Sequence, residues 1–96
     1  MRRGRAESIG LLIRQFLREE GLETPLNEQR LLMAWTDVMG EAISRYTGET
    51  YIKNQTLYVH IKSPALRANL MMTREQLIKR LNDHVGAQVI TSIVFR

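Results

Sequence analysis

The sequence predicts an α+β fold with the element order α-α-β-β-α-β, in which helices pack on a three-stranded sheet. Two sequence patterns and the composition lead to this prediction. Apolar residues recur every three to four positions in the helical stretches, and in the middle of the chain they change to strict alternation, the period of a strand. With 96 residues, 44% of them hydrophobic and 25% charged, the chain has the composition of a globular protein with room for one core.

The first two elements are predicted to be helices. A helix over residues 8–20 gathers on one face the apolar residues Ile9, Leu12, Ile13, Phe16 and Leu17. Thr24-Pro25 is a helix-start signal, which predicts a second helix over residues 25–46. The apolar stripe of this helix places Trp35 and Met39 in the core, and Met33 is expected there as well. Gly40, in its interior, suggests the close approach of another backbone.

The middle of the chain is predicted to form a β-hairpin. Apolar and polar residues alternate over residues 57–62, as in a strand with one buried face, and a shorter strand over residues 49–53 precedes it. If Asn54-Gln55 is the two-residue turn, Tyr51 lies opposite Tyr58 on the outer face and apolar residues meet on the inner face. Asn-Gln is a weaker turn signal than Asn-Gly, so a longer loop stays open as an alternative.

A third helix and a last strand complete the predicted order. Ser63-Pro64 repeats the helix-start signal, and leucines share one face beyond it, which predicts one helix over residues 64–84. The β-branched run over residues 89–95 predicts the last strand. A right-handed crossover would place the third helix on one face of the sheet, and the first two helices would cover the rest of that face. We expect residues 1–96 to form a single domain with the basic residues 1–5 as a mobile end.

The composition argues against several classes of function. The chain has no cysteine and 2 histidines, which excludes disulfides, a thiolate nucleophile and structural zinc, so neither a metal nor a cofactor is expected. It contains no Gly-x-Ser-x-Gly, no phosphate-binding glycine loop and no carboxylate pair beside a histidine, so we do not expect an enzyme. The apolar run at residues 9–13 is too short for a membrane span or an export signal, so we expect a cytoplasmic protein without membrane contact.

The net charge of +4 is unevenly distributed along the chain. Residues 1–50 hold 7 basic and 8 acidic side chains, whereas residues 51–96 hold 7 basic and 2 acidic ones. A surface that binds nucleic acid or an acidic partner needs such an asymmetry. A soluble protein that happens to be basic would show it as well.

Four segments, read in order, carry a resemblance to a known family: Ala34-Trp35-Thr36-Asp37-Val38-Met39-Gly40, Leu57-Tyr58-Val59-His60-Ile61, Ser63-Pro64-Ala65-Leu66-Arg67-Ala68-Asn69-Leu70 and Leu81-Asn82. The set resembles the DciA-like family, a bacterial family long catalogued only as a domain of unknown function. The resemblance implies a K-homology-like fold, a role beside the bacterial replicative helicase, and DNA binding. The chain has no Gly-x-x-Gly, so the backbone-clamping loop of true K-homology domains is not expected.

Two sets of residues are candidates for nucleic-acid binding. The third helix and its start carry Lys62, Arg67, Arg74, Lys79 and Arg80, where Arg67 and Arg74 are seven residues apart and would face the same way. The outer face of the hairpin carries the aromatic and basic mixture that stacks bases and holds phosphates: Tyr51, Lys53, Tyr58, His60 and Lys62. A solvated helix face, or an outer face covered by the first helix or by a second subunit, would show the same residues.

A third set, Glu19, Glu20 and Glu23, surrounds the end of the first helix, where it opposes the helix dipole. If the chain assists helicase loading, as the resemblance implies, these carboxylates are the candidate contact with the helicase. The leading interpretation is a non-enzymatic accessory factor of DNA replication, with DNA favoured over RNA. An RNA-binding module is the alternative. A protein-interaction domain or homodimer is a third class, and it would need an uncovered apolar patch.

Overall fold

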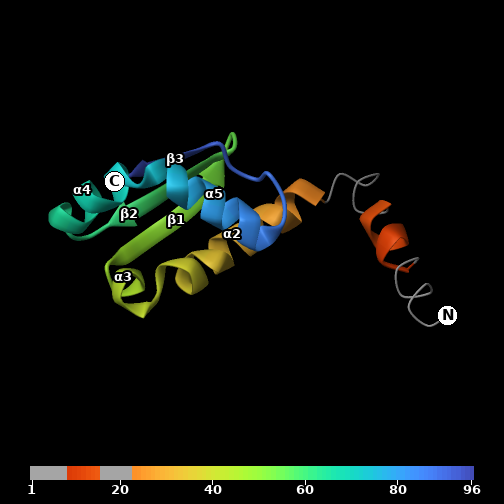
Figure 1. Ribbon diagram of the computed structural model, residues 1–96, viewed down its shortest axis with the longest axis horizontal. Helices are drawn as coiled ribbons and strands as arrows, with labels where there is room; N and C mark the ends of the chain where they lie inside the picture. The colour runs from red at the N-terminus through yellow and green to blue at the C-terminus, as the bar shows by residue number, and fades with distance from the viewer. Residues whose placement is uncertain (1–8, 16–22) are drawn as a thin grey trace.

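The computed structural model describes residues 9–15 and 23–96 (Figure 1). Residues 9–15 are helical, and the rest of the helix predicted over residues 8–20 lies outside the described residues. The elements that follow are α2 (Glu23–Met39), α3 (Glu41–Arg45), β1 (Thr47–Lys53), β2 (Thr56–Ile61), α4 (Pro64–Met72), α5 (Arg74–Val85) and β3 (Ser92–Phe95). The predicted α+β class is confirmed, and the element order is compatible with the K-homology-like fold that the resemblance implies.

The three strands form one mixed sheet with the order β1-β2-β3. β1 and β2 pair in antiparallel fashion in the predicted register, with Tyr51 opposite Tyr58 and Ile52 opposite Leu57. The two turn residues, Asn54 and Gln55, have φ angles of 52° and 59°, the left-handed values of a tight hairpin turn that matches the twist of the strands. β3 pairs in parallel with β2 and is shorter than the predicted strand.

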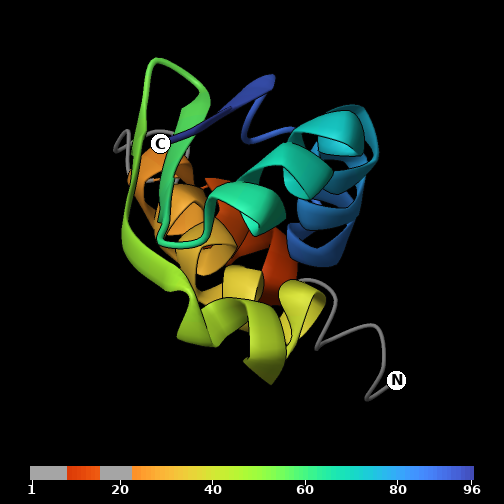
Figure 2. The ribbon, with the colours of Figure 1, turned by 90° about the vertical axis from the view of Figure 1, so that its left-hand side faces the viewer.

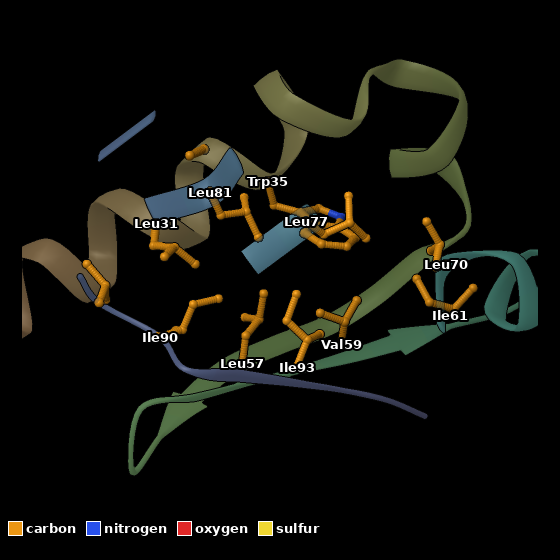
Figure 3. Close-up of a cluster of buried hydrophobic side chains, with 12 residues drawn as sticks. Leu31, Trp35, Leu57, Val59, Ile61, Leu70, Leu77, Leu81, Ile90 and Ile93 are labelled. Carbon is orange, nitrogen blue, oxygen red and sulfur yellow. The ribbon is translucent and has the colours of Figure 1, made fainter. Parts of the chain in front are cut away.

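Helices α2, α4 and α5 lie on one face of the sheet, and the core fills the space between the two layers (Figures 2 and 3). Trp35 of α2 is buried there, as predicted, and its Nε1–H donates to Thr47 Oγ1 at 3.0 Å. The core side chains from the two layers include Leu31, Leu57, Val59, Ile61, Leu77, Leu81 and Ile93. No described helix covers the opposite face of the sheet.

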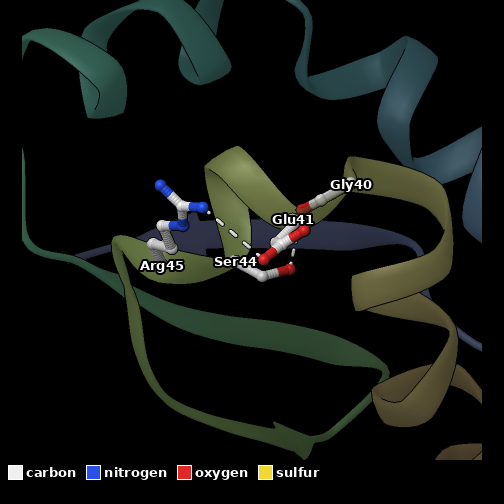
Figure 4. Close-up of polar contacts among 4 residues, drawn as sticks. All are labelled: Gly40, Glu41, Ser44 and Arg45. Carbon is white, nitrogen blue, oxygen red and sulfur yellow. Dashed lines mark hydrogen bonds and ion pairs between the residues drawn. The ribbon is translucent and has the colours of Figure 1, made fainter.

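Two predicted helices are interrupted, and both predictions of a continuous helix are wrong. The helix expected over residues 25–46 begins earlier, at Glu23, and breaks at Gly40, whose φ of 88° favours glycine. The predicted close approach at Gly40 is also wrong, since a Cβ there would meet nothing within 4 Å. α3 starts anew after the break, with Ser44 Oγ donating to Gly40 O at 2.8 Å and Arg45 pairing with Glu41 at 3.5 Å (Figure 4).

The second interruption divides the helix predicted over residues 64–84 into α4 and α5. Thr73, between them, has φ −110° and ψ 18°, and its hydroxyl donates to Leu70 O at 3.3 Å. Arg67 and Arg74 therefore belong to different helices, so their predicted common orientation on one helix is wrong. Met33, expected in the core, is also placed differently, because its side chain is 67% exposed.

Asn82 is the buried polar residue among those the structure describes, and it connects α5 to the segment that enters β3. Its Nδ2 donates to Ile90 O at 2.8 Å, and its Oδ1 accepts from Val89 N at 3.0 Å and Ile90 N at 3.1 Å. α5 ends at Val85, and the next residue, Gly86, has a left-handed φ of 83° that reverses the chain. The amide of one side chain thus holds the return from α5 to the sheet.

Asn82→Ala is expected to lower the free energy of unfolding by about 3 kcal/mol, because buried backbone groups at residues 89 and 90 would lose their partners. Asn69→Ala is the matched control. Asn69 is exposed on α4, so its loss should change stability by less than about 0.5 kcal/mol. Urea unfolding measures both variants. Equal losses would show that Asn82 does not hold the strand.

Gln55→Gly is expected to stabilise the protein by about 0.5 to 1 kcal/mol, because glycine removes the strain of a left-handed φ but costs chain entropy. The hydrogen bond from Thr91 N to Gln55 O, 2.8 Å long, uses the backbone and should persist. The control is Thr56→Gly, at the first residue of β2, which should destabilise instead. Thermal unfolding of the two variants distinguishes turn strain from a general effect of glycine.

Candidate nucleic-acid interface

The uncovered outer face of the sheet carries a stack of two tyrosines and an arginine. Because Tyr51 and Tyr58 are a cross-strand pair, their side chains lie next to each other, with ring centroids 4.8 Å apart and planes 12° from parallel. The guanidinium carbon of Arg96 lies 4.8 Å from the Tyr58 centroid and 5.6 Å from that of Tyr51. Both distances are within the range of a cation–π contact, so the three side chains hold one another in place.

These side chains line a shallow hollow of about 330 Å³ together with Glu49 and His60. His60 is exposed, and its ring lies against Gly48: a Cβ on that glycine would be 2.7 Å from His60 Cδ2. Gly48 therefore leaves the room that the imidazole occupies. Glu49 gives the hollow one carboxylate, which opposes the binding of an anion there.

Two lysines lie at opposite ends of the hairpin. Lys53 is the last residue of β1 and is exposed beside the turn. Lys62, also exposed, directly follows β2 at the other end, where its backbone N–H donates to Tyr46 O at 2.8 Å. The tyrosine pair and Arg96 therefore lie between Lys53 and Lys62, the lysines at the two ends of the hairpin.

Arg96 is missing from the sequence-based candidates. Its backbone continues the pairing with β2, because Arg96 N donates to Val59 O and Ile61 N donates to Arg96 O, both at 2.8 Å. Ile93 is buried on the inner face, so alternation places Arg96 on the outer one. The same alternation could have identified Arg96 from the sequence, once Ile93 had been assigned to the inner face of the last strand.

The basic residues of the predicted third helix make different contacts in the structure. Arg67 Nη2 donates to Ile61 O at 2.8 Å, while its buried Nε has no hydrogen-bond partner among the described residues. Arg80 Nη2 donates to Val38 O at 3.0 Å, in the last turn of α2. Lys79 pairs with Asp83 at 2.9 Å, and Arg74 is exposed at the start of α5. Arg67 and Arg80 thus contact backbone carbonyls of neighbouring elements.

The acidic set predicted to meet a partner lies almost wholly outside the described residues. Glu19 and Glu20 belong to the undescribed part of the chain, and Glu23 is the first residue of α2. Within residues 9–15 and 23–96, no three histidine or acidic side chains gather as metal ligands. None of the helices in these ranges is long and apolar enough to cross a membrane.

Comparison with known proteins identifies a family whose model matches this chain. The family model described as "Dna[CI] antecedent, DciA" matches residues 8–95. The chain is 30% identical over 87 residues to a UPF0232 protein of Mycolicibacterium paratuberculosis, and 25% identical over 88 residues to one of Corynebacterium glutamicum.

These alignments cover 91% and 92% of this chain but only 48% and 49% of the two relatives. The chain therefore spans about half the length of the curated relatives it matches. The family model, in contrast, extends over nearly all of the chain, including both strands of the tyrosine hairpin and the Asn82 connection. On this match, the chain belongs to the DciA family.

Proposed function

We propose that this chain is a non-enzymatic accessory module of bacterial DNA replication, which holds single-stranded DNA on the outer face of its sheet and assists loading of the replicative helicase in the cytoplasm. The observation that supports DNA binding most directly is the outer face itself: Tyr51 and Tyr58 stack there, and Arg96 lies over Tyr58. The helicase part of the proposal follows from the family resemblance.

The outer face has the chemistry that single-stranded nucleic acid requires. Aromatic rings provide stacking surfaces for bases, and arginine and lysine attract the phosphates that run beside them. Contact with the tyrosine rings fixes the guanidinium of Arg96 before any ligand arrives, so little side-chain entropy is lost on binding. Among the described side chains, Lys53 and Lys62 pair with no carboxylate and extend the positive surface beyond both ends of the tyrosine stack.

The charge distribution supports the same assignment. Of the 7 basic side chains in residues 51–96, Lys53, Lys62 and Arg96 lie on or beside the hairpin and the outer face, and the other four belong to α4 and α5. A positive field of this kind speeds the encounter with a polyanion. The first half, with 7 basic and 8 acidic side chains, adds no net positive charge.

Tyr58→Leu is expected to weaken binding of a labelled oligothymidylate by roughly tenfold to a hundredfold, because a base loses an aromatic surface worth about 1–3 kcal/mol. Arg96→Gln should lower the slope of log affinity against log salt by about 0.7, the value for one phosphate contact on a single strand. Fluorescence anisotropy over a range of salt concentrations measures both quantities.

Arg45→Gln is the control, because it removes the same charge from α3, where Arg45 pairs with Glu41. It should leave the salt slope unchanged. If Arg74→Gln with Lys79→Gln lowers the slope while Arg96→Gln does not, DNA contacts the helices and the proposed face is wrong. A matched RNA strand that binds more tightly than DNA would favour the RNA-binding alternative.

Replacing Glu19, Glu20 and Glu23 together by lysine is expected to weaken association with the replicative helicase of the same organism, most strongly at low salt, because opposite charges speed and orient such encounters. DNA binding should stay equal or become stronger. Co-elution measures the helicase contact.

The matched control reverses three exposed carboxylates elsewhere, Glu41, Glu75 and Asp83, and so changes the net charge equally. Helicase association that both triple variants weaken equally would show only a net-charge effect. Association that neither weakens would place the contact on another surface, and absence of association by the unmodified chain would contradict the helicase proposal.

A further inference from the structure

A β-bulge lies in β1, away from the hairpin turn. The register against β2 shifts between Thr47 and Thr50, so that Gly48 and Glu49 both lie opposite His60. The extra residue lets Thr47 face the core, where its hydroxyl accepts the hydrogen bond of the buried indole, while Glu49 lines the hollow on the outer face. Bulges of this kind often redirect a side chain beside a functional site.

The carboxylate of Glu49 is available to a ligand. Its side chain is exposed, and it forms no ion pair with any side chain that the structure describes. The hollow that it lines has a volume of about 330 Å³, near the lower end of the range of small-molecule sites, about 300–1,000 Å³. This size suits one planar ring system better than a length of nucleic-acid backbone.

The chemistry of the hollow also suits a base better than a phosphate. Tyr58 and His60 both line it, and because they are two residues apart on β2, their rings lie on the same side of the sheet. Aromatic rings are surfaces on which unpaired bases stack. The carboxylate of Glu49 repels a phosphate, so the backbone of a bound strand would pass outside the hollow.

Hydrogen-bonding capacity distinguishes the four bases at a carboxylate. A carboxylate only accepts hydrogen bonds, through two oxygens, and a single strand exposes the Watson–Crick edges of its bases. Guanine presents two donors side by side on that edge, N1–H and the N2 amine. Cytosine and adenine present one amine beside an acceptor nitrogen, and thymine presents one N–H between two carbonyl oxygens, which a carboxylate repels.

We infer that the outer face selects guanine in single-stranded DNA, with the base in the hollow beside Tyr58 and His60 and with Glu49 accepting from its N1–H and N2 amine. This inference rests on the proposed function, because it names the base that the proposed DNA-binding face prefers. Thymine-only strands still bind through stacking and phosphate contacts, but they gain nothing from Glu49.

Arg96 provides the complementary group on the other side of His60. Its backbone pairs with β2 at the residues before and after His60, so the strand order places His60 between Glu49 and Arg96. The guanidinium of Arg96 only donates hydrogen bonds, and O6 and N7 of guanine are the acceptors that arginine binds most often. The hollow therefore has an acceptor on one border and a donor on the other, as guanine requires.

Four labelled strands of equal length test the inference: one of thymine alone, and three in which the central base is guanine, adenine or hypoxanthine. Adenine controls for the stacking of a purine. Guanine is expected to bind roughly fivefold to tenfold more tightly than adenine, the lower part of the range for a bidentate base contact because Glu49 is exposed. Hypoxanthine, which lacks the N2 amine, should fall between them. Fluorescence anisotropy measures the four affinities.

Glu49→Gln keeps the shape of the side chain and removes the carboxylate. It should bring guanine and adenine to within about twofold of each other, and the thymine strand should bind equally or more tightly. Glu75→Gln is the matched control, since Glu75 is an exposed carboxylate on α5, and it should leave the preference for guanine unchanged.

The outcomes separate this inference from the proposed function. Equal affinity of the unmodified chain for all four strands would overturn the selection of guanine and leave DNA binding intact. A preference for guanine that persists in Glu49→Gln would overturn Glu49 as the selecting residue. Absence of binding to every strand would overturn the proposed DNA binding and the base selection with it.

Discussion

The hydrogen bonds of the Asn82 side chain join the helical layer to the last strand, and the outer face depends on that junction. β3 pairs in parallel with β2, so the chain must cross from one end of the sheet to the other through α4 and α5 before it can pair. Asn82 fixes the backbone at residues 89 and 90, where this crossing ends. Arg96 follows β3 directly. Its position over the tyrosines therefore depends on the buried side-chain amide of Asn82 in the helical layer.

The hairpin supplies the other half of the outer face through backbone geometry alone. Two consecutive left-handed residues in the turn fix the register, and a shift of one residue would put the two tyrosines on opposite faces of the sheet, one of them toward the core. The same register sets Leu57 and Val59 against the helices. One turn therefore determines both the apolar inner face and the aromatic outer face. Core packing and the candidate interface both depend on the register that this turn sets.

The sequence predicted some of these features and missed others. Local periodicity predicted the strands, the turn and the tyrosine pair, since each depends on neighbours in the chain. Periodicity failed at Gly40 and Thr73, because the apolar stripe continues on both sides of each break and a helix-breaking φ leaves no trace in it. Arg96 was missed for another reason: its neighbours Tyr51 and Tyr58 become apparent only when the pairing of β3 with β2 is known.

The sheet separates Trp35 from the stacked tyrosines, so the two have different optical signals. Trp35, the 1 tryptophan of the chain, is buried on the helical side with its ring 6.5 Å from that of Phe95, whereas the stacked Tyr51 and Tyr58 face outward. Tryptophan fluorescence consequently follows the integrity of the core. The near-ultraviolet circular dichroism of the tyrosine stack follows the geometry of the outer face, so unfolding and occupation of that face have separate spectroscopic signals in the same unlabelled sample.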